Sequence, residues 1–179
     1  MVAQDIAVEA LRALVNELPD PEIPVITLGD LGIVRDVRID AGAAVIKLTP
    51  TYSGCPATEA IREDVLKTVA SAGYDHATVD IVLSPAWSTS WISQRGRDRL
   101  RAYGIAPPID DEERAARTPS GPVDSSPLRV IRFHRKSTLT CPRCASAHVE
   151  ELSAYGSTPC KALYRCLACR EPFDYFKPY

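Results

Sequence analysis

Two pairs of closely spaced cysteines near the C-terminal end are the residues best suited to bind a metal. They form two C-x-x-C knuckles separated by 21 residues: Cys141 with Cys144, and Cys166 with Cys169. Each knuckle presents two sulfur atoms from one tight turn, and two knuckles supply the four ligands of a tetrahedral zinc site. The spacing predicts a structural Zn²⁺ at these cysteines, and a redox or iron-sulfur role for the same thiols is the alternative.

A fifth thiol, Cys160, falls between the two knuckles. It could replace one zinc ligand, but the symmetric spacing of the knuckles favours the other four cysteines. His134 and His148 flank the knuckles. We interpret both as surface residues or as outer neighbours of the site rather than as ligands.

The sixth cysteine, Cys55, stands alone in the stretch TPTYSGCPAT. Pro56 suits the first position of a helix, which would put Cys55 beside the helix N-cap. There the unpaired N–H groups and the helix dipole would lower the pKa of the thiol and make the sulfur a nucleophile or a soft-metal ligand. A thiol that acts only as a small hydrophobic group is the alternative.

A second loop, PDPEIPV, holds Asp20 and Glu22 among three prolines. The prolines make the loop rigid, so the two carboxylates are presented in a fixed arrangement. If this loop and the Cys55 loop lie at the same end of a sheet, oxygen and sulfur ligands converge there. Solvated loop charges are the alternative interpretation.

The elements that must position these residues follow from the hydrophobic pattern, which predicts an α-β-β-α-β-α unit with a mixed three-stranded sheet. Helices are expected from Asp5 to Leu18, from about Pro56 to Ser71 and from about Thr89 to Tyr103, and strands over residues 33–39, 44–48 and 77–83. The first two strands form a hairpin, and the third pairs in parallel after a crossover helix. Trp87 and Trp91 share one face of the last helix, which favours the core, or alternatively a partner interface.

The domain organisation follows a change in composition after the last helix. We expect an α/β domain over residues 1–105, a flexible linker with five prolines over 106–127, and a four-cysteine zinc ribbon over 128–179. Strands of the ribbon are expected in HVEELSAYG and ALYRC. The fold class is therefore α+β with a C-terminal zinc ribbon, whose small core needs metal to fold.

The overall composition, 179 residues with 45% hydrophobic content, is typical of a globular protein. No apolar run approaches the roughly 18 residues that cross a membrane, and the N-terminal stretch lacks the features of a signal peptide. We expect a cytoplasmic protein with reduced thiols and without membrane contact.

The charges are unevenly distributed along the chain. Residues 1–127 contain 12 Lys and Arg against 19 Asp and Glu, whereas residues 128–179 contain 9 against 4. Such polarity suits contact between the two domains, an acidic partner, or nucleic acid. The basic runs RVIRFHRK and RGRDRLR have few interleaved aromatic residues, so a protein contact is favoured and nucleic acid is not expected.

The two loops together resemble a known family. DPEIPVITLGDLGIVRDV followed by TPTYSGCPA resembles the SufT-like family of iron-sulfur assembly factors, whose DPE loop and T-x-x-x-C-P loop are matched by Asp20 to Glu22 and Thr51 to Pro56. With SPAWSTSWIS and the two knuckles, the chain outside the linker is also similar to the family of D subunits of phenylacetyl-CoA 1,2-epoxidases, which act in aerobic phenylacetate catabolism.

This resemblance implies an accessory protein and not an enzyme. Such a protein would assist insertion of iron or an iron-sulfur cluster into the oxygenase or reductase subunits of the epoxidase. Cys55 would be the transient iron or cluster ligand, with Asp20, Glu22 and Thr51 lining the same site. Because one thiolate cannot hold a cluster, a homodimer or a client protein would supply the remaining ligands.

Two other classes of function compete with this one. The first is a zinc-ribbon module for protein interaction or nucleic-acid binding. The second is a thiol-dependent enzyme with Cys55 as nucleophile, for which His76 is the only candidate base in the first domain.

Overall fold

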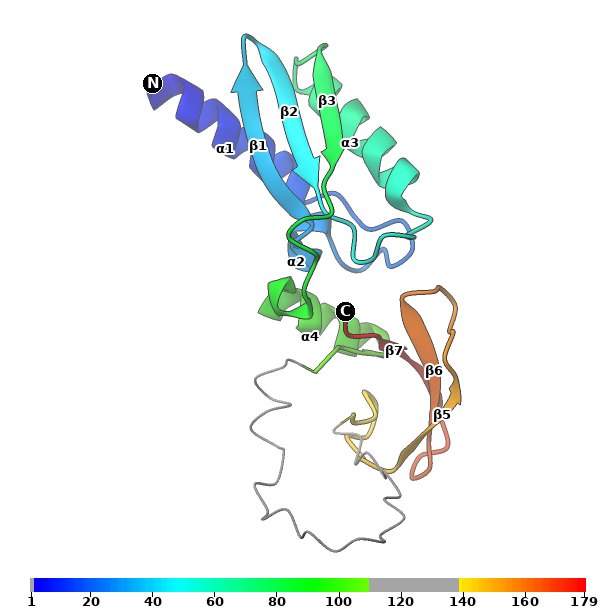
Figure 1. The fold of residues 1–179 in the computed structure, drawn as a ribbon. Helices are drawn as coiled ribbons and strands as arrows, with labels where there is room; N and C mark the ends of the chain where they lie inside the picture. The colour runs from blue at the N-terminus through cyan, green and yellow to red at the C-terminus, as the bar shows by residue number, and fades with distance from the viewer. Residues whose placement is uncertain (1, 110–138) are drawn as a thin grey trace, which may run out of the picture.

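The computed structural model describes residues 2–109 and 139–179. Figure 1 shows an α/β unit at one end of the molecule and a curved β-ribbon at the other. In chain order the elements are α1 (Val2–Asn16), α2 (Leu28–Leu31), β1 (Val34–Asp40), β2 (Ala43–Leu48), α3 (Thr58–Ser71), β3 (Ala77–Ile81), η1 (Thr89–Trp91), α4 (Gln94–Tyr103), β4 (Ile105–Ala106), β5 (Val149–Ser153), β6 (Lys161–Cys166) and β7 (Pro172–Phe176). The predicted α+β fold class with a C-terminal ribbon is confirmed.

The sheet of the α/β unit has the strand order β1-β2-β3. Strands β1 and β2 are antiparallel, and β2 and β3 are parallel, as the sequence predicts. Ala41 and Gly42, both with positive φ, form the tight hairpin turn. Helices α1 and α3 lie on the same face of the sheet (Figure 1), where they bury an apolar core that includes Leu11, Val15, Val37, Ile46, Val65, Val69 and Val79.

The start of α3 differs from the sequence prediction. The helix begins at Thr58, with Ala57 as its N-cap, so Pro56 is not the first helical residue and Cys55 lies three positions before the helix. Cys55 is held instead in two successive turns. Its N–H donates to the carbonyl of Tyr52 (3.2 Å), and its own carbonyl accepts from Thr58 N (3.3 Å) and Thr58 Oγ1 (2.8 Å).

The predicted helix from Thr89 to Tyr103 is wrong as a single element. Ile92 adopts an extended conformation and separates η1 from α4, which Ser93 caps by accepting from Gly96 N. Trp87 precedes both helices, so it does not share a helix face with Trp91. Trp87 is in the core as expected, and its Nε1 donates to the carbonyl of Leu31 (2.8 Å), whereas Trp91 lies partly exposed beneath the guanidinium of Arg35.

The ribbon contains a strand from each side of the expected linker. Its sheet order is β4-β7-β6-β5, in which β7 was not foreseen from the sequence and β4 pairs in parallel with β7. Ala106 is therefore a buried strand residue opposite Tyr175 and not the first residue of the linker. The remainder of the expected linker from residue 110, and the run RVIRFHRK with His134, lie outside the described residues.

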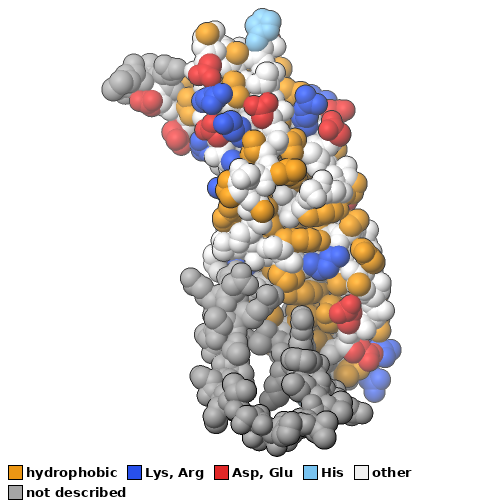
Figure 2. Space-filling model, viewed as in Figure 1, with side chains coloured by type: hydrophobic (Ala, Val, Ile, Leu, Met, Phe, Trp, Pro, Cys, Tyr) orange, Lys and Arg blue, Asp and Glu red, His pale blue; other side chains and the backbone are white. Residues whose placement is uncertain are grey.

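The ribbon and the α/β unit share one core. Phe176, at the end of β7, is 1% exposed and its ring lies 6.2 Å from that of Trp87. Tyr179 stacks on Tyr52 at 5.5 Å. Figure 2 shows hydrophobic side chains continuing on this face from the α/β unit onto the ribbon.

The described helices include none with the length and apolar character required to span a bilayer.

Candidate functional site

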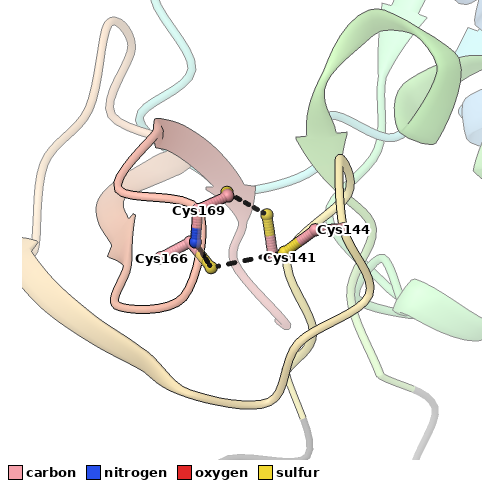
Figure 3. A group of neighbouring side chains, drawn as sticks. All are labelled: Cys141, Cys144, Cys166 and Cys169. Carbon is pink, nitrogen blue, oxygen red and sulfur yellow. Dashed lines mark hydrogen bonds between the residues drawn. The ribbon is translucent and has the colours of Figure 1, made fainter.

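The four knuckle cysteines converge at the end of the ribbon (Figure 3). Cys166 ends β6, Cys169 lies in the turn before β7, and the other two come from the turn that precedes β5. The Sγ atoms of Cys141 and Cys169 are 3.8 Å apart, those of Cys144 and Cys166 are 3.5 Å apart, and all four lie within 4.8 Å of one another. Four sulfurs around a tetrahedral Zn²⁺ are separated by about 3.8 Å, which these distances match.

The backbone of the two knuckles is built in the same way. The N–H of each first cysteine donates to a carbonyl five residues ahead, Cys141 to Ser146 and Cys166 to Glu171. The residue after each second cysteine, Ala145 or Arg170, has a positive φ. This repeated geometry turns both sulfur pairs toward one point.

The thiol of Cys166 is prepared for metal binding by the backbone. The N–H of Cys169 donates to Cys166 Sγ (3.5 Å). This bond is the largest of several causes, with the N–H of Ala168 and the thiols of Cys144 and Cys169, that lower the pKa of Cys166 to about 6. In the same cluster a backbone bond with Glu171 lowers the pKa of Cys169, but burial and the other three thiols outweigh this bond and raise that pKa to about 12. Thiolate is the form that binds metal, so the described chain offers a four-sulfur metal-binding cluster with suitable chemistry. His148 is exposed and stands outside this group, as does Cys160.

The DPE loop buries one of its two carboxylates. Asp20 is 8% exposed, and its Oδ1 accepts hydrogen bonds from the N–H groups of Glu22 (2.9 Å) and Ile23 (2.8 Å). Burial raises the pKa of Asp20, while these bonds and the charge of Lys161 oppose the rise. Asp20 is therefore not a solvated loop charge, because it is buried and its carboxylate holds the loop in shape through two backbone hydrogen bonds.

Glu22 is partly buried and points across the junction to the ribbon. Its Oε2 lies 3.9 Å from Cys160 Sγ. Burial and the neighbouring Asp20 raise the pKa of Glu22, while Lys161 and the Cys160 thiol lower it. The loop carboxylate and a thiol that is distant in the sequence are thus neighbours.

Cys55 lies close enough to both carboxylates to interact with them. Burial raises the pKa of the Cys55 thiol, Glu22 and Asp20 raise it further, and the N–H of Ala57 opposes the rise. The prediction of a lowered thiol pKa is wrong, because Cys55 is half-buried, faces negative charge and is not at the helix N-cap.

The fourth residue expected at this site, Thr51, is partly buried on the same loop. Within residues 2–109 and 139–179 its side chain makes no hydrogen bond. The structure therefore brings Asp20, Glu22 and Cys55 close to one another. Thr51 lies on the same loop as Cys55 but makes no hydrogen bond to any of these three residues.

Four residues at the same place were not assigned to it by sequence reasoning: Tyr52, Cys160, Lys161 and Tyr179. Three of them come from the ribbon, and no local pattern signals that they meet the α/β loops. Tyr52 was visible in the sequence as an aromatic residue three positions before Cys55. Its hydroxyl is buried and has no hydrogen-bond partner in the described part of the chain.

His76 is far from Cys55 along the sheet. Its carbonyl accepts from Ala44 N at the start of β2, whereas Cys55 follows the other end of that strand. Four residue-to-residue steps along the strand separate Ala44 from Leu48, which is roughly 13 Å. His76 therefore cannot serve as a base for Cys55.

Comparisons with known proteins match both parts of the chain. Residues 8–81 match the family described as iron-sulfur cluster assembly protein, and residues 126–177 match the PaaD zinc beta ribbon domain. The chain is 45% identical over 170 residues to the D subunit of a "Putative 1,2-phenylacetyl-CoA epoxidase" from Escherichia coli, covering 95% of this chain and 92% of that protein.

Two further relatives are similar to the α/β unit. One is an "Fe-S protein maturation auxiliary factor" from Porphyromonas gingivalis, 33% identical over 48% of this chain and 83% of that protein. The other is the crystal structure of a DUF59 domain of unknown function from Bacillus anthracis, 30% identical with a TM-score of 0.52 over 55% of this chain and 95% of that one. The match over 95% of the chain shows that it belongs to the family of phenylacetyl-CoA epoxidase D subunits, and in this chain an iron-sulfur cluster assembly domain precedes a PaaD zinc ribbon.

Proposed function

We propose that this protein is an accessory maturation factor for a phenylacetyl-CoA epoxidase and assists insertion of iron or an iron-sulfur cluster into the oxygenase or reductase subunits. Cys55 is the thiol that holds the cargo transiently, and Asp20 and Glu22 shape its surroundings. The protein does not catalyse the oxygenation itself.

The observation that carries this proposal is that Cys55 lies near enough to Asp20, which is largely buried, and Glu22, which is partly buried, for their charges to act on its thiol. Soft sulfur and hard oxygen donors suit iron in both of its common oxidation states. Burial keeps the thiol protonated until a metal displaces the proton, so the site suits transient rather than permanent binding.

The four-cysteine cluster has a separate role in this proposal. Its four sulfurs close a tetrahedral site and leave no position for exchange, which is typical of structural zinc. We assign Zn²⁺ to Cys141, Cys144, Cys166 and Cys169, where it would stabilise the ribbon.

Replacing Cys55 with Ala tests the proposal in cells that make the complete epoxidase. The variant removes the only cysteine that precedes the metal knuckles in the sequence and leaves the turn carbonyl bonds in place. We expect the iron content of the purified oxygenase and the iron and sulfide content of the reductase to fall several-fold. Epoxidase activity should fall in proportion.

The matched control is Ser53→Ala, an exposed position on the same loop. It should leave iron loading unchanged. If Cys55→Ala also leaves iron and sulfide in both client subunits at the level of the unaltered protein, Cys55 is not the transfer thiol and the proposal is wrong.

A further inference from the structure

Tyr179 follows β7 in the ribbon, yet its ring lies against the loop of the α/β unit that carries Cys55. The ring stacks on that of Tyr52, with centroids 5.5 Å apart and planes inclined by 14°. Tyr52 is three positions before Cys55, and the N–H of Cys55 donates to the Tyr52 carbonyl (3.2 Å). The ribbon therefore places an aromatic ring on the same turn that presents the proposed cargo thiol.

The ring of Tyr52 lies close to the backbone of this turn. Its Cε2 atom is 3.5 Å from the position that a Cβ would take at Gly54, the residue before Cys55. Its hydroxyl is buried and has no hydrogen-bond partner within residues 2–109 and 139–179, so packing holds the ring in place. The turn, the Tyr52 ring and the Tyr179 ring thus lie next to one another in that order.

Both rings are near enough to the Cys55 thiol to interact with it. Burial is the largest cause that raises the pKa of Tyr52 to about 12, and Cys55 is the next. Burial also raises the pKa of Tyr179, and Cys160, Tyr155 and Cys55 contribute to this rise. Cys55 itself is half-buried. The thiol and the aromatic stack therefore occupy one small region of the junction.

The backbone around Tyr179 is anchored to the ribbon, whereas its ring is held only lightly. The N–H of Lys177 donates to the Cys160 carbonyl (2.9 Å), and Lys177 Nζ donates to the Ala154 carbonyl (3.1 Å). The hydroxyl of Tyr179 donates to the Pro159 carbonyl over a long 3.5 Å, and the residue is 44% exposed. An exposed side chain changes rotamer readily, so this ring can turn away without opening the core.

We propose that Tyr179 is a cover for the Cys55 turn, which shields the thiol while its ring stacks on Tyr52 and admits a larger partner when the ring turns away. This inference rests on the proposed function and deepens it, because a transient carrier must protect its thiol between loading and delivery. An aromatic pair favours the stacked state by roughly two- to tenfold, so the cover opens often. The ribbon thereby takes part in handling the cargo.

Two maleimides of different size test the cover on the full-length protein, prepared without oxygen and with its metal retained. N-ethylmaleimide is the small reagent and fluorescein maleimide the bulky one, and peptide mass spectrometry measures the rate of each at Cys55. Both reagents react with the thiolate. The ratio of the bulky to the small rate therefore reports access to the sulfur and is insensitive to the pKa of the thiol.

Tyr179→Ala should raise this ratio by roughly two- to tenfold, the range by which an aromatic pair favours the closed state. Tyr179→Phe keeps the ring and loses only the long bond to Pro159, so it should retain the ratio of the unaltered protein. The matched control is Tyr103→Ala, which removes an exposed tyrosine from α4 and should leave the ratio unchanged.

Tryptophan emission of each variant shows whether the ribbon remains seated, because Trp87 is buried against Phe176. It should be the same in Tyr179→Ala as in the unaltered protein. An unchanged ratio in Tyr179→Ala, or a raised ratio that appears together with shifted tryptophan emission, would show that Tyr179 is not a cover. Iron loading in the Cys55→Ala strain judges the proposed function separately, since the maleimide ratio does not depend on any cargo.

Discussion

Asp30 is the most heavily bonded carboxylate of the described chain, and it joins α2 to α4. It is 1% exposed and accepts from Arg95 Nε (2.7 Å), Arg99 Nη1 (2.9 Å) and Ser93 Oγ (2.8 Å). Burial alone would raise its pKa, but these bonds outweigh burial and lower the pKa below the usual value. The side chain therefore stabilises the fold in its charged form.

Replacing Asp30 with Asn should reduce the free energy of unfolding by roughly 1–3 kcal/mol at neutral pH, as expected for hydrogen bonds to a charged group. The unaltered protein should lose this contribution as the pH falls below about 4, because the folded state binds the proton less readily than the unfolded state. Urea unfolding at pH 7 and at pH 3.5 measures both effects.

Asp98→Asn is the matched control, since Asp98 pairs with Arg101 on the exposed face of α4, the helix that carries Arg95 and Arg99. It should change stability by less than about 0.5 kcal/mol. Equal losses for the two variants, or a difference between Asp30→Asn and the unaltered protein that persists undiminished at pH 3.5, would contradict this role of Asp30.

At the residue scale, the sequence predicts some parts of the sites and not others. The four knuckle cysteines are recognisable because the spacing within each turn encodes their convergence. The direction of the Cys55 pKa shift is not predictable in this way, because it depends on burial and on charges from another loop. Cys160 is missed for the same reason, since the carboxylate that it contacts, Glu22, is 138 positions away.

At the scale of elements, β7 links the two units through its last residue. Phe176 packs against Trp87 in the core of the α/β unit, whereas Phe173, three residues earlier on the same strand, packs in the ribbon beside Cys166. One short strand thus supplies an aromatic side chain to each of two apolar clusters.

Replacing Phe176 with Ala should cost about 3–5 kcal/mol, the usual loss for a buried aromatic residue, and should loosen the ribbon from the α/β unit. Because Trp87 would then face solvent, its fluorescence should shift to longer wavelength before global unfolding. Denaturant titration followed by fluorescence and by circular dichroism measures the separation of the two transitions.

Phe173→Ala removes the same side chain from the ribbon cluster and is the matched control. It should weaken the ribbon without changing Trp87 emission in the folded protein. If both variants unfold in one transition with unchanged Trp87 emission, Phe176 does not couple the units.

The elements themselves are largely predictable where periodicity is strong. The hairpin of β1 and β2, the crossover and the parallel β3 follow from apolar alternation and turn residues. The break at Ile92 and the late start of α3 do not, because side-chain bonds from Ser93 and Thr58 decide them. Strand β4 is too short to show a pattern, and only pairing with β7 defines it.

At the scale of the whole molecule, the four-cysteine cluster and the shared core lie at opposite ends of the ribbon. The four sulfurs gather at the end of β6, while Phe176 and Cys160 pack into the α/β unit at the other end. The α/β unit has an extensive core of its own and the ribbon has a small one. Removing a metal from the four cysteines should therefore destabilise the ribbon more than the α/β unit.

Removing the metal with a strong chelator should unfold the ribbon and leave the α/β sheet intact, since structural zinc contributes about 10 kcal/mol or more to small folds. Hydrogen exchange should show loss of protection at β5, β6 and β7 and retained protection at β1 and β2. Returning Zn²⁺ should restore the ribbon. Unchanged exchange in β6 after complete metal removal would show that the cluster is not structural.

Strand β4 also determines how this ribbon can be moved between proteins. A graft that begins after the proline-rich segment would omit Ile105 and Ala106, which form the outer edge of the ribbon sheet. The transferred ribbon would expose the free edge of β7, and such edges recruit strands from other molecules. The transferable unit, for an engineer or for gene fusion in evolution, is therefore discontinuous in the chain and includes two residues that precede the segment.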